Sequence, residues 1–264
     1  MSTGTVQPGA ATPIQTMITA VSRVEDVHPA LRRVTLTGPA IGDLVLPGPE
    51  AFFHLLLPPP GRATLTVDTS FTWEAYAATP EGDRPRGAYY TVWEHRPASA
   101  EIDVLVVLHG GVATASAWAA RANPGDPVAI WGPRTAFAPP PAASRWVLCA
   151  DETGTPAAAG VLRARPPGTP AILLLETDTP ATRQPLGDLP DVEVRWCYRR
   201  GRPAGSTTLL PDALADESPG PDAFVWAAAE HEAVAAVRDI VAAAGVRRAH
   251  RSLLAYWRRS APTT

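Results

Sequence analysis

Apolar residues in the first half of the chain fall into short runs separated by turn residues. Four runs have the length and composition of strands, at residues 18–24, 31–37, 52–57 and 102–108. In residues 102–108 only Asp103 is not apolar, which predicts a strand buried on both faces. We therefore expect an antiparallel β-barrel over residues 17–137, preceded by a mobile tail of small and polar residues over 1–16.

The pattern changes after a proline-rich stretch at residues 138–143. Beyond it, apolar runs alternate with helical segments: strands at 146–150, 171–176, 192–197 and 224–229, and helices at 155–165, 209–215 and 230–244. Such alternation predicts a parallel α/β sheet with helices on its faces, over residues 145–264. We expect the aromatic segment 253–257 to fold back over this sheet or over the domain interface.

Two places in this pattern suit a ligand. Ligands of parallel sheets bind at the carboxyl ends of the strands, which here carry residues 151–153, residues 176–178 and the pair Glu230-His231. In the barrel half, residues 109–114 lead into a helix expected over 115–122, and free N–H groups at a helix start suit a phosphate. A nucleotide cofactor is one interpretation of that stretch, and a plain hairpin with a connecting helix is the other.

Residues 58–86 form a long excursion that holds Phe71, Trp73 and Tyr76. Long loops in compact domains are commonly functional, so these aromatic residues suggest a lid or a substrate wall. A small apolar cluster packed under the loop is the alternative interpretation.

Composition and charge narrow the partners and the compartment. All 23 basic residues are arginine, the net charge is -3 and the pI is about 6.1, so no nucleic-acid partner is expected. The N-terminus lacks a signal-peptide pattern and no apolar run reaches 18 residues, which predicts a cytoplasmic protein with no membrane partner. Cys149 and Cys197 lie in apolar runs and should be buried thiols. The six histidines have no metal-ligand spacing, so no metal site is expected.

The order of several short motifs resembles that of a known family. The motifs are Tyr90-Thr91-Val92, Leu108-His109-Gly110, Ala115-Ser116, Pro124-Gly125-Asp126, Gly132-Pro133-Arg134, Asp151-Glu152-Thr153 and Tyr256-Trp257-Arg258. Over roughly residues 17–260 this order resembles the siderophore-interacting protein family. Its members are FAD-dependent ferric-siderophore reductases that use NAD(P)H and have a ferredoxin-reductase-like fold. The resemblance implies a flavin-binding barrel, a nucleotide-binding α/β domain and a small-molecule substrate, a ferric chelate.

The resemblance also implies roles for individual residues. Tyr90 would lie against the isoalloxazine ring of FAD and Thr91 would hydrogen-bond the edge of that ring. The other residues expected on the FAD side are Val92, His109, Gly110, Ala115 and Ser116. Those expected on the nicotinamide side are Thr153, Glu230 and Trp257, with Trp257 facing the same interdomain cleft as Tyr90. The substrate-pocket candidates are His54, Trp73, Arg86 and Trp93.

The chain departs from the family pattern at two kinds of position. Ala88 and Trp93 stand where the family usually has arginine, and one charge-assisted hydrogen bond to phosphate is worth about 1.5–3 kcal/mol. Arg86 lies one pleat away on the same strand face and would partly replace the arginine missing at residue 88. Alanine stands at residues 113, 150 and 229, where the family usually has glycine, and a Cβ there would obstruct the approach of a ligand.

These observations lead to three hypotheses. The first is an FAD-dependent NAD(P)H oxidoreductase that reduces a ferric siderophore or a related acceptor. The second is a repurposed family member that has lost nicotinamide binding, and with it flavin binding in the extreme case, and acts as a cyclase or isomerase on a specialised metabolite. The third is a non-catalytic protein that binds a ferric chelate through its arginines.

Overall fold

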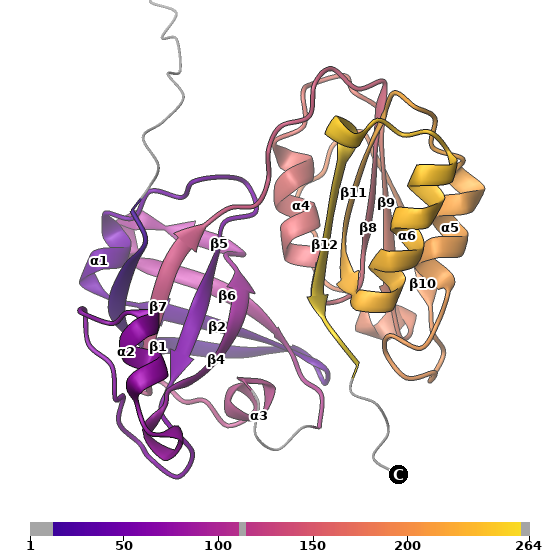
Figure 1. The fold of residues 1–264 in the computed structure, drawn as a ribbon. Helices are drawn as coiled ribbons and strands as arrows, with labels where there is room; N and C mark the ends of the chain where they lie inside the picture. Colours follow the sequence, from indigo (N-terminus) through magenta and orange to yellow (C-terminus); the bar gives the residue numbers. More distant parts are fainter. Residues whose placement is uncertain (1–12, 111–114, 260–264) are drawn as a thin grey trace, which may run out of the picture. The chain divides into compact units, whose positions relative to one another are not determined.

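The computed structural model of the protein describes residues 13–110 and 115–259. Their contacts divide the chain into two compact units, with the main division between Ala136 and Phe137. Residues 25–33 and 105–109 are counted in the second unit. The first unit is built on an antiparallel sheet and the second on a parallel sheet (Figure 1).

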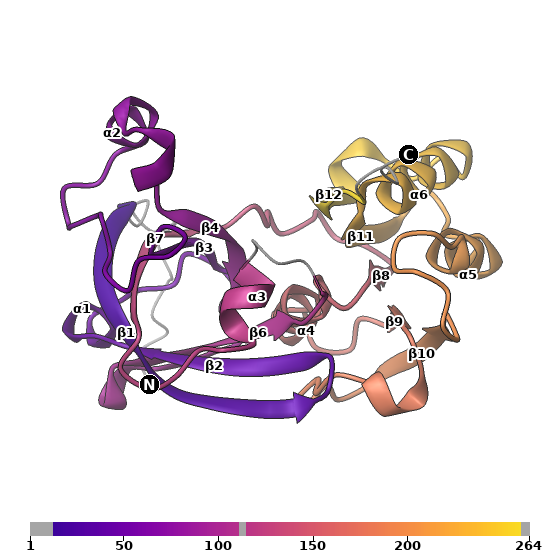
Figure 2. The ribbon, with the colours of Figure 1, turned by 90° about the horizontal axis from the view of Figure 1, so that it is seen from below.

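Seven strands form the antiparallel sheet, in the order β4-β3-β7-β1-β2-β6-β5. Their bounds are β1 Gln15–His28, β2 Leu31–Thr37, β3 Phe52–Leu57, β4 Arg86–Thr91, β5 Glu94–Arg96, β6 Glu101–Val107 and β7 Pro127–Arg134. The sheet curls into a half-barrel (Figures 1 and 2), which confirms the antiparallel architecture expected for this half. Most of the tail expected over residues 1–16 lies outside the described residues, and Gln15 already begins β1.

Strand β6 is buried on both faces, as its apolar run predicts. Its charged residue, Asp103, is 1% exposed and accepts hydrogen bonds from the Arg96 guanidinium at 2.7 and 2.9 Å and from the Thr35 hydroxyl at 2.7 Å. A buried carboxylate needs such partners because removing an unpaired charge from water costs several kcal/mol. Asp103 therefore ties β5 and β2 to β6.

The helices of this unit are short: α1 Pro39–Gly42, α2 Trp73–Ala78 and α3 Ala115–Ala119. The helix expected over 115–122 ends earlier because its last turn tightens, with the N–H of Arg121 bonded to the carbonyl of Trp118 at 3.0 Å. Helix α2 lies inside the excursion 58–86, where no helix was expected. It begins at Thr72, whose hydroxyl accepts the N–H of Ala75 at 3.1 Å.

Five parallel strands form the second sheet, in the order β10-β9-β8-β11-β12, which confirms the parallel α/β half. Their bounds are β8 Arg145–Ala150, β9 Ala171–Thr177, β10 Val192–Tyr198, β11 Ala223–Glu230 and β12 Arg251–Trp257. Helix α4, Thr155–Arg163, packs on one face through Ala157, Val161 and Leu162. Helices α5, Leu209–Glu217, and α6, His231–Ala243, pack on the other face. No helix in the described part of the chain is long and apolar enough to cross a membrane.

The C-terminal aromatic segment is part of the parallel sheet. Residues 253–257 were expected to fold back over the sheet or over the interface, and this expectation is wrong. They belong to β12, the edge strand, which pairs in parallel with β11 from Val225↔Arg251 to Ala229↔Ala255. The end of β12 therefore lies at the carboxyl edge of the sheet together with the ends of the other four strands.

Candidate functional site

The carboxyl edge of the parallel sheet collects polar side chains from all five strands. Asp151 follows β8, Asp178 follows β9 and Arg199 follows β10, while Glu230 ends β11 and Trp257 ends β12. Because the strands are parallel, these residues lie at one edge although up to 106 positions separate them. The sequence predicts this edge as a ligand site.

Asp151 is the centre of the edge. Its Oδ1 accepts the N–H of Thr153 at 2.8 Å and the Thr153 hydroxyl at 2.6 Å. Its Oδ2 accepts the N–H of Glu230 at 2.9 Å and the indole N–H of Trp257 at 2.7 Å. Burial raises the pKa of this carboxyl group, and the bonds from Thr153 and Trp257 oppose the rise. The three residues expected on the nicotinamide side, Thr153, Glu230 and Trp257, therefore all converge on one carboxyl group.

Glu230 and Trp257 are held by further contacts. The Glu230 carboxylate accepts the N–H of Glu232 at 2.5 Å, capping α6, and the N–H of Arg259 at 3.0 Å. Gly205 has φ +66, and a Cβ at this position would lie 2.6 Å from the Glu230 Cγ and 2.9 Å from the Trp257 ring. Only glycine fits both this backbone conformation and this spacing, so the loop at Gly205 passes directly over Glu230 and Trp257.

A buried ion pair continues the edge toward β10. Arg199, which is 7% exposed, donates two hydrogen bonds to the Glu152 carboxylate, at 2.6 and 2.9 Å. It also lies 3.5 Å from the Glu176 carboxylate, which accepts the Thr207 hydroxyl at 2.8 Å. Burial raises the pKa of Glu176, opposed by Thr207 and Arg199. These contacts fix the loops after β8, β9 and β10 relative to one another.

The alanines at two expected glycine positions serve the core. Ala150 is 0% exposed and packs with the α4 face of the sheet, and Ala229 is 2% exposed and packs with the α5 and α6 face. Their methyl groups thus fill helix–sheet contacts. The sequence argument that these Cβ atoms obstruct a nucleotide loses its support at these two positions. Ala113 and Thr114 lie outside the described residues.

Strand β4 carries the residues expected to hold the flavin ring. It is an end strand of the antiparallel sheet, paired with β3 so that Tyr90 lies opposite Phe53 and Ala88 opposite Leu55. Tyr90 is half-buried, and burial raises the pKa of its hydroxyl. Thr91 and Val92 are each 8% exposed, and the N–H of Val92 donates to the Ala51 carbonyl at 2.8 Å. Arg86, Ala88 and Tyr90 alternate along the strand and so share one face.

The other residues expected around FAD lie in and before α3. His109 and Gly110 are exposed at the end of the segment after β6, and a Cβ at Gly110 would meet nothing within 4 Å. Ala115 and Ser116 begin α3 and are buried, at 8% and 4% exposed. The backbone between the two pairs falls on residues 111–114, outside the described residues.

An aromatic cluster occupies the opposite face of β3 and β4. His54, Tyr89 and Trp131 are cross-strand neighbours on β3, β4 and β7. Two rings of the excursion, Phe71 and Trp73, pack on them, and Tyr76 packs on Phe71 and Trp73. Two substrate candidates meet here, since the ring centroids of His54 and Trp73 are 5.2 Å apart. Arg134 stacks on Trp131 at 3.9 Å. Trp93, the third aromatic candidate, lies between β4 and β5, where its backbone N–H donates to the Asp103 carbonyl at 2.8 Å.

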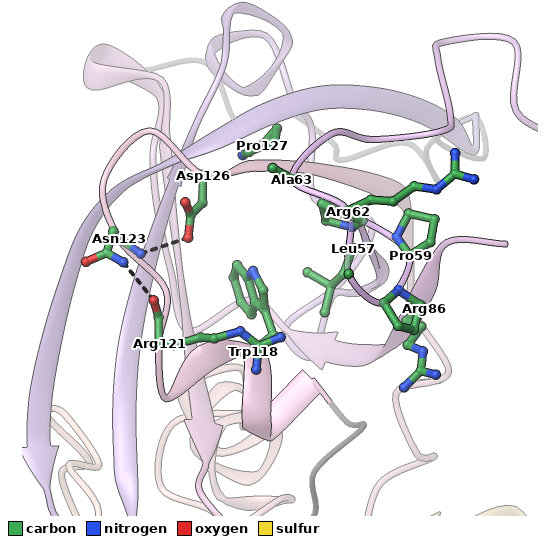
Figure 3. Close-up of a pocket in the computed structure, with 13 residues that line it drawn as sticks. Leu57, Pro59, Arg62, Ala63, Arg86, Trp118, Arg121, Asn123, Asp126 and Pro127 are labelled. Atoms are coloured by element: carbon green, nitrogen blue, oxygen red, sulfur yellow. Dashed lines mark hydrogen bonds between the residues drawn. The ribbon is translucent and has the colours of Figure 1, made fainter. Parts of the chain in front are cut away.

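A cavity of about 510 Å³ lies beyond the Arg86 end of β4, and Arg86, the fourth substrate candidate, lines it (Figure 3). Its walls are the segment from Leu57 to Ala63, the ring of Trp118, and the turn from Asn123 to Pro127. Arg62, Arg86 and Arg121 line it with one carboxylate, Asp126. The volume is within the range of about 300–1,000 Å³ typical of small-molecule pockets. The first unit thus offers an aromatic face for a flat ring at Tyr90 and one cation for phosphate, Arg86, on the same strand, so its residues fit a flavin dinucleotide.

The sequence does not predict the roles of several of these residues. Asp151 stood in a predicted edge motif, but its role as the shared acceptor depends on β11 and β12 ending beside β8. Trp118 and Arg121 followed a predicted anion-binding helix start, yet their cavity depends on the distant residues 57–63. The sequence feature that could have identified Asp151 as a site residue is its position directly after an apolar strand.

Two profiles of one family match most of the sequence. The "Siderophore-interacting FAD-binding domain" matches residues 20–137 and the "Siderophore-interacting protein" domain matches residues 143–260. The chain belongs to the siderophore-interacting protein family. This confirms the resemblance of the motif order, and it makes the first half of this family member an FAD-binding domain.

Curated relatives of this siderophore-interacting protein include a ferric-siderophore reductase. An uncharacterized protein of Mycobacterium tuberculosis is 38% identical over 149 residues, 56% of this chain and 51% of that protein. Ferric vibriobactin reductase ViuB of Vibrio cholerae is 26% identical over 226 residues, 83% of this chain and 80% of that protein. The chain spans about half the length of the first curated relatives that it matches.

Solved structures confirm the fold class. A siderophore utilization protein from T. fusca has a TM-score of 0.79 at 29% identity. The match covers 94% of this chain and 95% of the T. fusca chain. The ferredoxin reductase of carbazole 1,9a-dioxygenase has a TM-score of 0.67 at 18% identity. The match covers 94% of this chain and 69% of the reductase chain, and it shows a similarity of fold alone. The expected ferredoxin-reductase-like fold is therefore confirmed.

Proposed function

We propose that this protein is an FAD-dependent oxidoreductase that oxidises NAD(P)H and reduces a ferric siderophore or a similar ferric chelate. The observation that carries the proposal is the siderophore-interacting FAD-binding domain over residues 20–137, with Tyr90 and Thr91 at the end of its edge strand. The similarity to ferric vibriobactin reductase over 83% of the chain supports the acceptor class. The cyclase or isomerase alternative has no such support, and the packing of Ala150 and Ala229 removes part of its motive.

Each residue group would have a physical task in this reaction. When bound, FAD supplies the step between a two-electron donor and a one-electron acceptor. Tyr90 would press its ring against the flat flavin, and Thr91 would hydrogen-bond the flavin edge. On the second unit, Asp151 would hold the indole of Trp257 and the backbone of Glu230 at the edge where parallel sheets bind nucleotides. One hydride carries two electrons, so each NAD(P)H would yield two ferrous ions and one proton.

The test is a coupled assay with FAD-loaded protein in air-free buffer. Oxidation of NADH or NADPH is followed together with trapping of ferrous ion by a coloured chelator, using a ferric hydroxamate and a ferric catecholate as acceptors. The proposal expects two ferrous ions per NAD(P)H consumed, at a rate well above that of free FAD. Ferric reduction no faster than free FAD with either acceptor and either nucleotide would refute it.

A matched pair of variants locates the flavin ring. Tyr90→Leu removes the ring on the proposed flavin face, whereas Tyr89→Leu removes a neighbouring ring that is 52% exposed on the opposite face. FAD affinity should fall about tenfold in Tyr90→Leu, since stacking of a flat ring on an aromatic side chain is worth about 1–3 kcal/mol. It should stay near the wild-type value in Tyr89→Leu. Equal losses in the two variants would place the ring elsewhere.

A further inference from the structure

Strand β4 presents no positive charge at residue 88. Ala88 lies opposite Leu55 on the face shared by Arg86 and Tyr90. A methyl group offers no hydrogen bond to an oxyanion, so a phosphate near this position needs another partner. The nearest charged residue on the same face is Arg86, one pleat further along.

The cavity at the Arg86 end of β4 has the missing charge. Three arginines reach it from different segments, and Asp126, its one carboxylate, already accepts the N–H of Asn123 at 2.9 Å. The side chains that line the cavity therefore carry an excess of positive charge, and Arg62 also pairs with Asp83. The two come from opposite walls: Arg121 extends beside Trp118, and Arg86 extends from the wall near Leu57 and Pro59 (Figure 3). An anion in this cavity is therefore flanked by cations, in a chain whose net charge is -3.

Trp118 adds a flat aromatic surface to this cation pair. Its ring lines the cavity, although the residue as a whole is only 8% exposed. Stacking on an aromatic ring accepts any nucleobase, because every base has a π face. A cavity that combines an aromatic wall with paired arginines is suited to a nucleotide, which has a flat base at one end and phosphates at the other.

Distances along β4 connect this cavity to Tyr90. The four residues from Tyr90 to Arg86 span about 13 Å of strand. A flavin ring at Tyr90 would then have its ribityl chain beside Ala88 and its phosphates beside Arg86. Riboflavin would end before the cavity, whereas a dinucleotide would extend into it.

We propose that the cavity lined by Arg86, Arg121 and Trp118 binds the adenosine-phosphate half of FAD and replaces the phosphate contact that Ala88 does not make. This inference rests on the proposed flavin-dependent function. Free ADP shares the same chemistry, and a separate ADP site is the other source that the experiment must distinguish.

The test measures binding, not turnover. Quenching of flavin fluorescence gives the affinity for FAD and for riboflavin in the wild type and in the variants Arg86→Gln, Arg121→Gln and Trp118→Leu. Arg238→Gln, an exposed residue on α6 of the second unit, carries the same change of charge and is the control. We expect each arginine variant to bind FAD at least about tenfold more weakly, the loss of one charge-assisted hydrogen bond, with riboflavin affinity unchanged. ADP should compete with FAD in the wild type and much less in Arg121→Gln.

Other outcomes overturn the assignment. An unchanged FAD affinity in the double variant Arg86→Gln/Arg121→Gln would remove the cavity from the flavin site. Equal losses for FAD and riboflavin would indicate a general disturbance of the domain. ADP that binds in an arginine-dependent manner without displacing FAD would mean a separate nucleotide site. Arginine-dependent FAD binding in a protein that fails the ferric reduction assay would refute the reductase proposal and leave the cavity assignment standing.

Discussion

The indole N–H of Trp257 donates to the Oδ2 of Asp151 at 2.7 Å, joining the last residue of β12 to the first residue after β8. The same oxygen accepts the N–H of Glu230 at 2.9 Å, and Oδ1 accepts both donors of Thr153. Strand β11 lies between β8 and β12 in the sheet, so this carboxyl group spans three neighbouring strand ends. These bonds hold together the edge that is expected to receive NAD(P)H.

Substitution of either partner should destabilise the protein by more than an ordinary surface change. Trp257→Phe should cost about 1–3 kcal/mol of unfolding free energy, because a buried carboxyl group loses one of its four donors. Asp151→Asn should cost a similar amount, because its amide NH2 would face N–H donors. Urea unfolding of both single variants and the double variant tests the coupling. The double variant should cost clearly less than the sum of the single variants, and strict additivity would contradict the described bond.

His54 should make the protein acid-sensitive. Burial, with a smaller effect of the Arg134 charge, lowers its pKa from 6.5 to about 4. Between these values the unfolded chain binds more protons than the native one, so stability is present above pH 6.5 and is lost as pH falls toward 4. The contribution of His54 to the slope of unfolding free energy against pH should stay below about 1.4 kcal/mol per pH unit, which is the limit for one titrating proton.

His54→Phe isolates this effect, because phenylalanine keeps a ring against Trp73 and Tyr89 but does not titrate. The slope of unfolding free energy between pH 4 and 6.5 should become shallower in the variant. Burial also lowers the pKa of His28, so a smaller histidine contribution to the slope should remain in His54→Phe and should be removed in His28→Gln/His54→Phe. An unchanged slope in His54→Phe would show that His54 titrates normally in the native state.

Gly154 should tolerate no side chain. A Cβ there would lie 2.1 Å from the Ala228 carbonyl oxygen and 2.9 Å from the Ala228 Cβ, so either α4 or β11 must move. Gly154→Ala should cost about 1–3 kcal/mol, the usual cost of overpacking. Gly220→Ala is the control, since a Cβ there meets nothing within 4 Å and should change stability by less than about 0.5 kcal/mol. Equal melting temperatures for the two variants would rule out the described contact between residue 154 and β11.

Restoring an arginine on β4 should strengthen FAD binding. Ala88→Arg adds a cation midway between Tyr90 and Arg86, where the ribityl and phosphate groups are proposed to lie. FAD affinity should rise about tenfold, the value of one moderate charge-assisted hydrogen bond. Ala88→Gln, which adds length without charge, should give little gain. If fluorescence titration finds no gain in either variant, an arginine at residue 88 does not reach the phosphates.

The sequence predicts most elements because their apolar runs have strand or helix periodicity and clear turn boundaries. It does not place β12 in the sheet, because the pairing of Leu253 and Leu254 with Ala227 and Ala228 is a non-local contact. It also misses α2, whose six residues are too few for a helix to be stable without packing on Trp131 and His54.

In the candidate site, too, local motifs identify single residues, whereas contacts between distant residues cannot be predicted from the sequence. The motifs point to Thr153, Glu230 and Trp257 one by one, and Asp151 brings them together only through the parallel strand order. Arg199 and Glu152 are 47 positions apart, and no periodicity connects them. The sequence also does not show which face of the sheet the methyl groups of Ala150 and Ala229 pack against, because that depends on register.

The measurement that tests the central proposal most directly is the visible spectrum of FAD-loaded protein during anaerobic titration, first with NADH or NADPH and then with a ferric chelate. The account predicts that the flavin band bleaches with one equivalent of the nucleotide and returns when two equivalents of ferric chelate are added, with ferrous ion released. A flavin band that persists with both nucleotides, or that bleaches but is not restored by any ferric chelate, would contradict it.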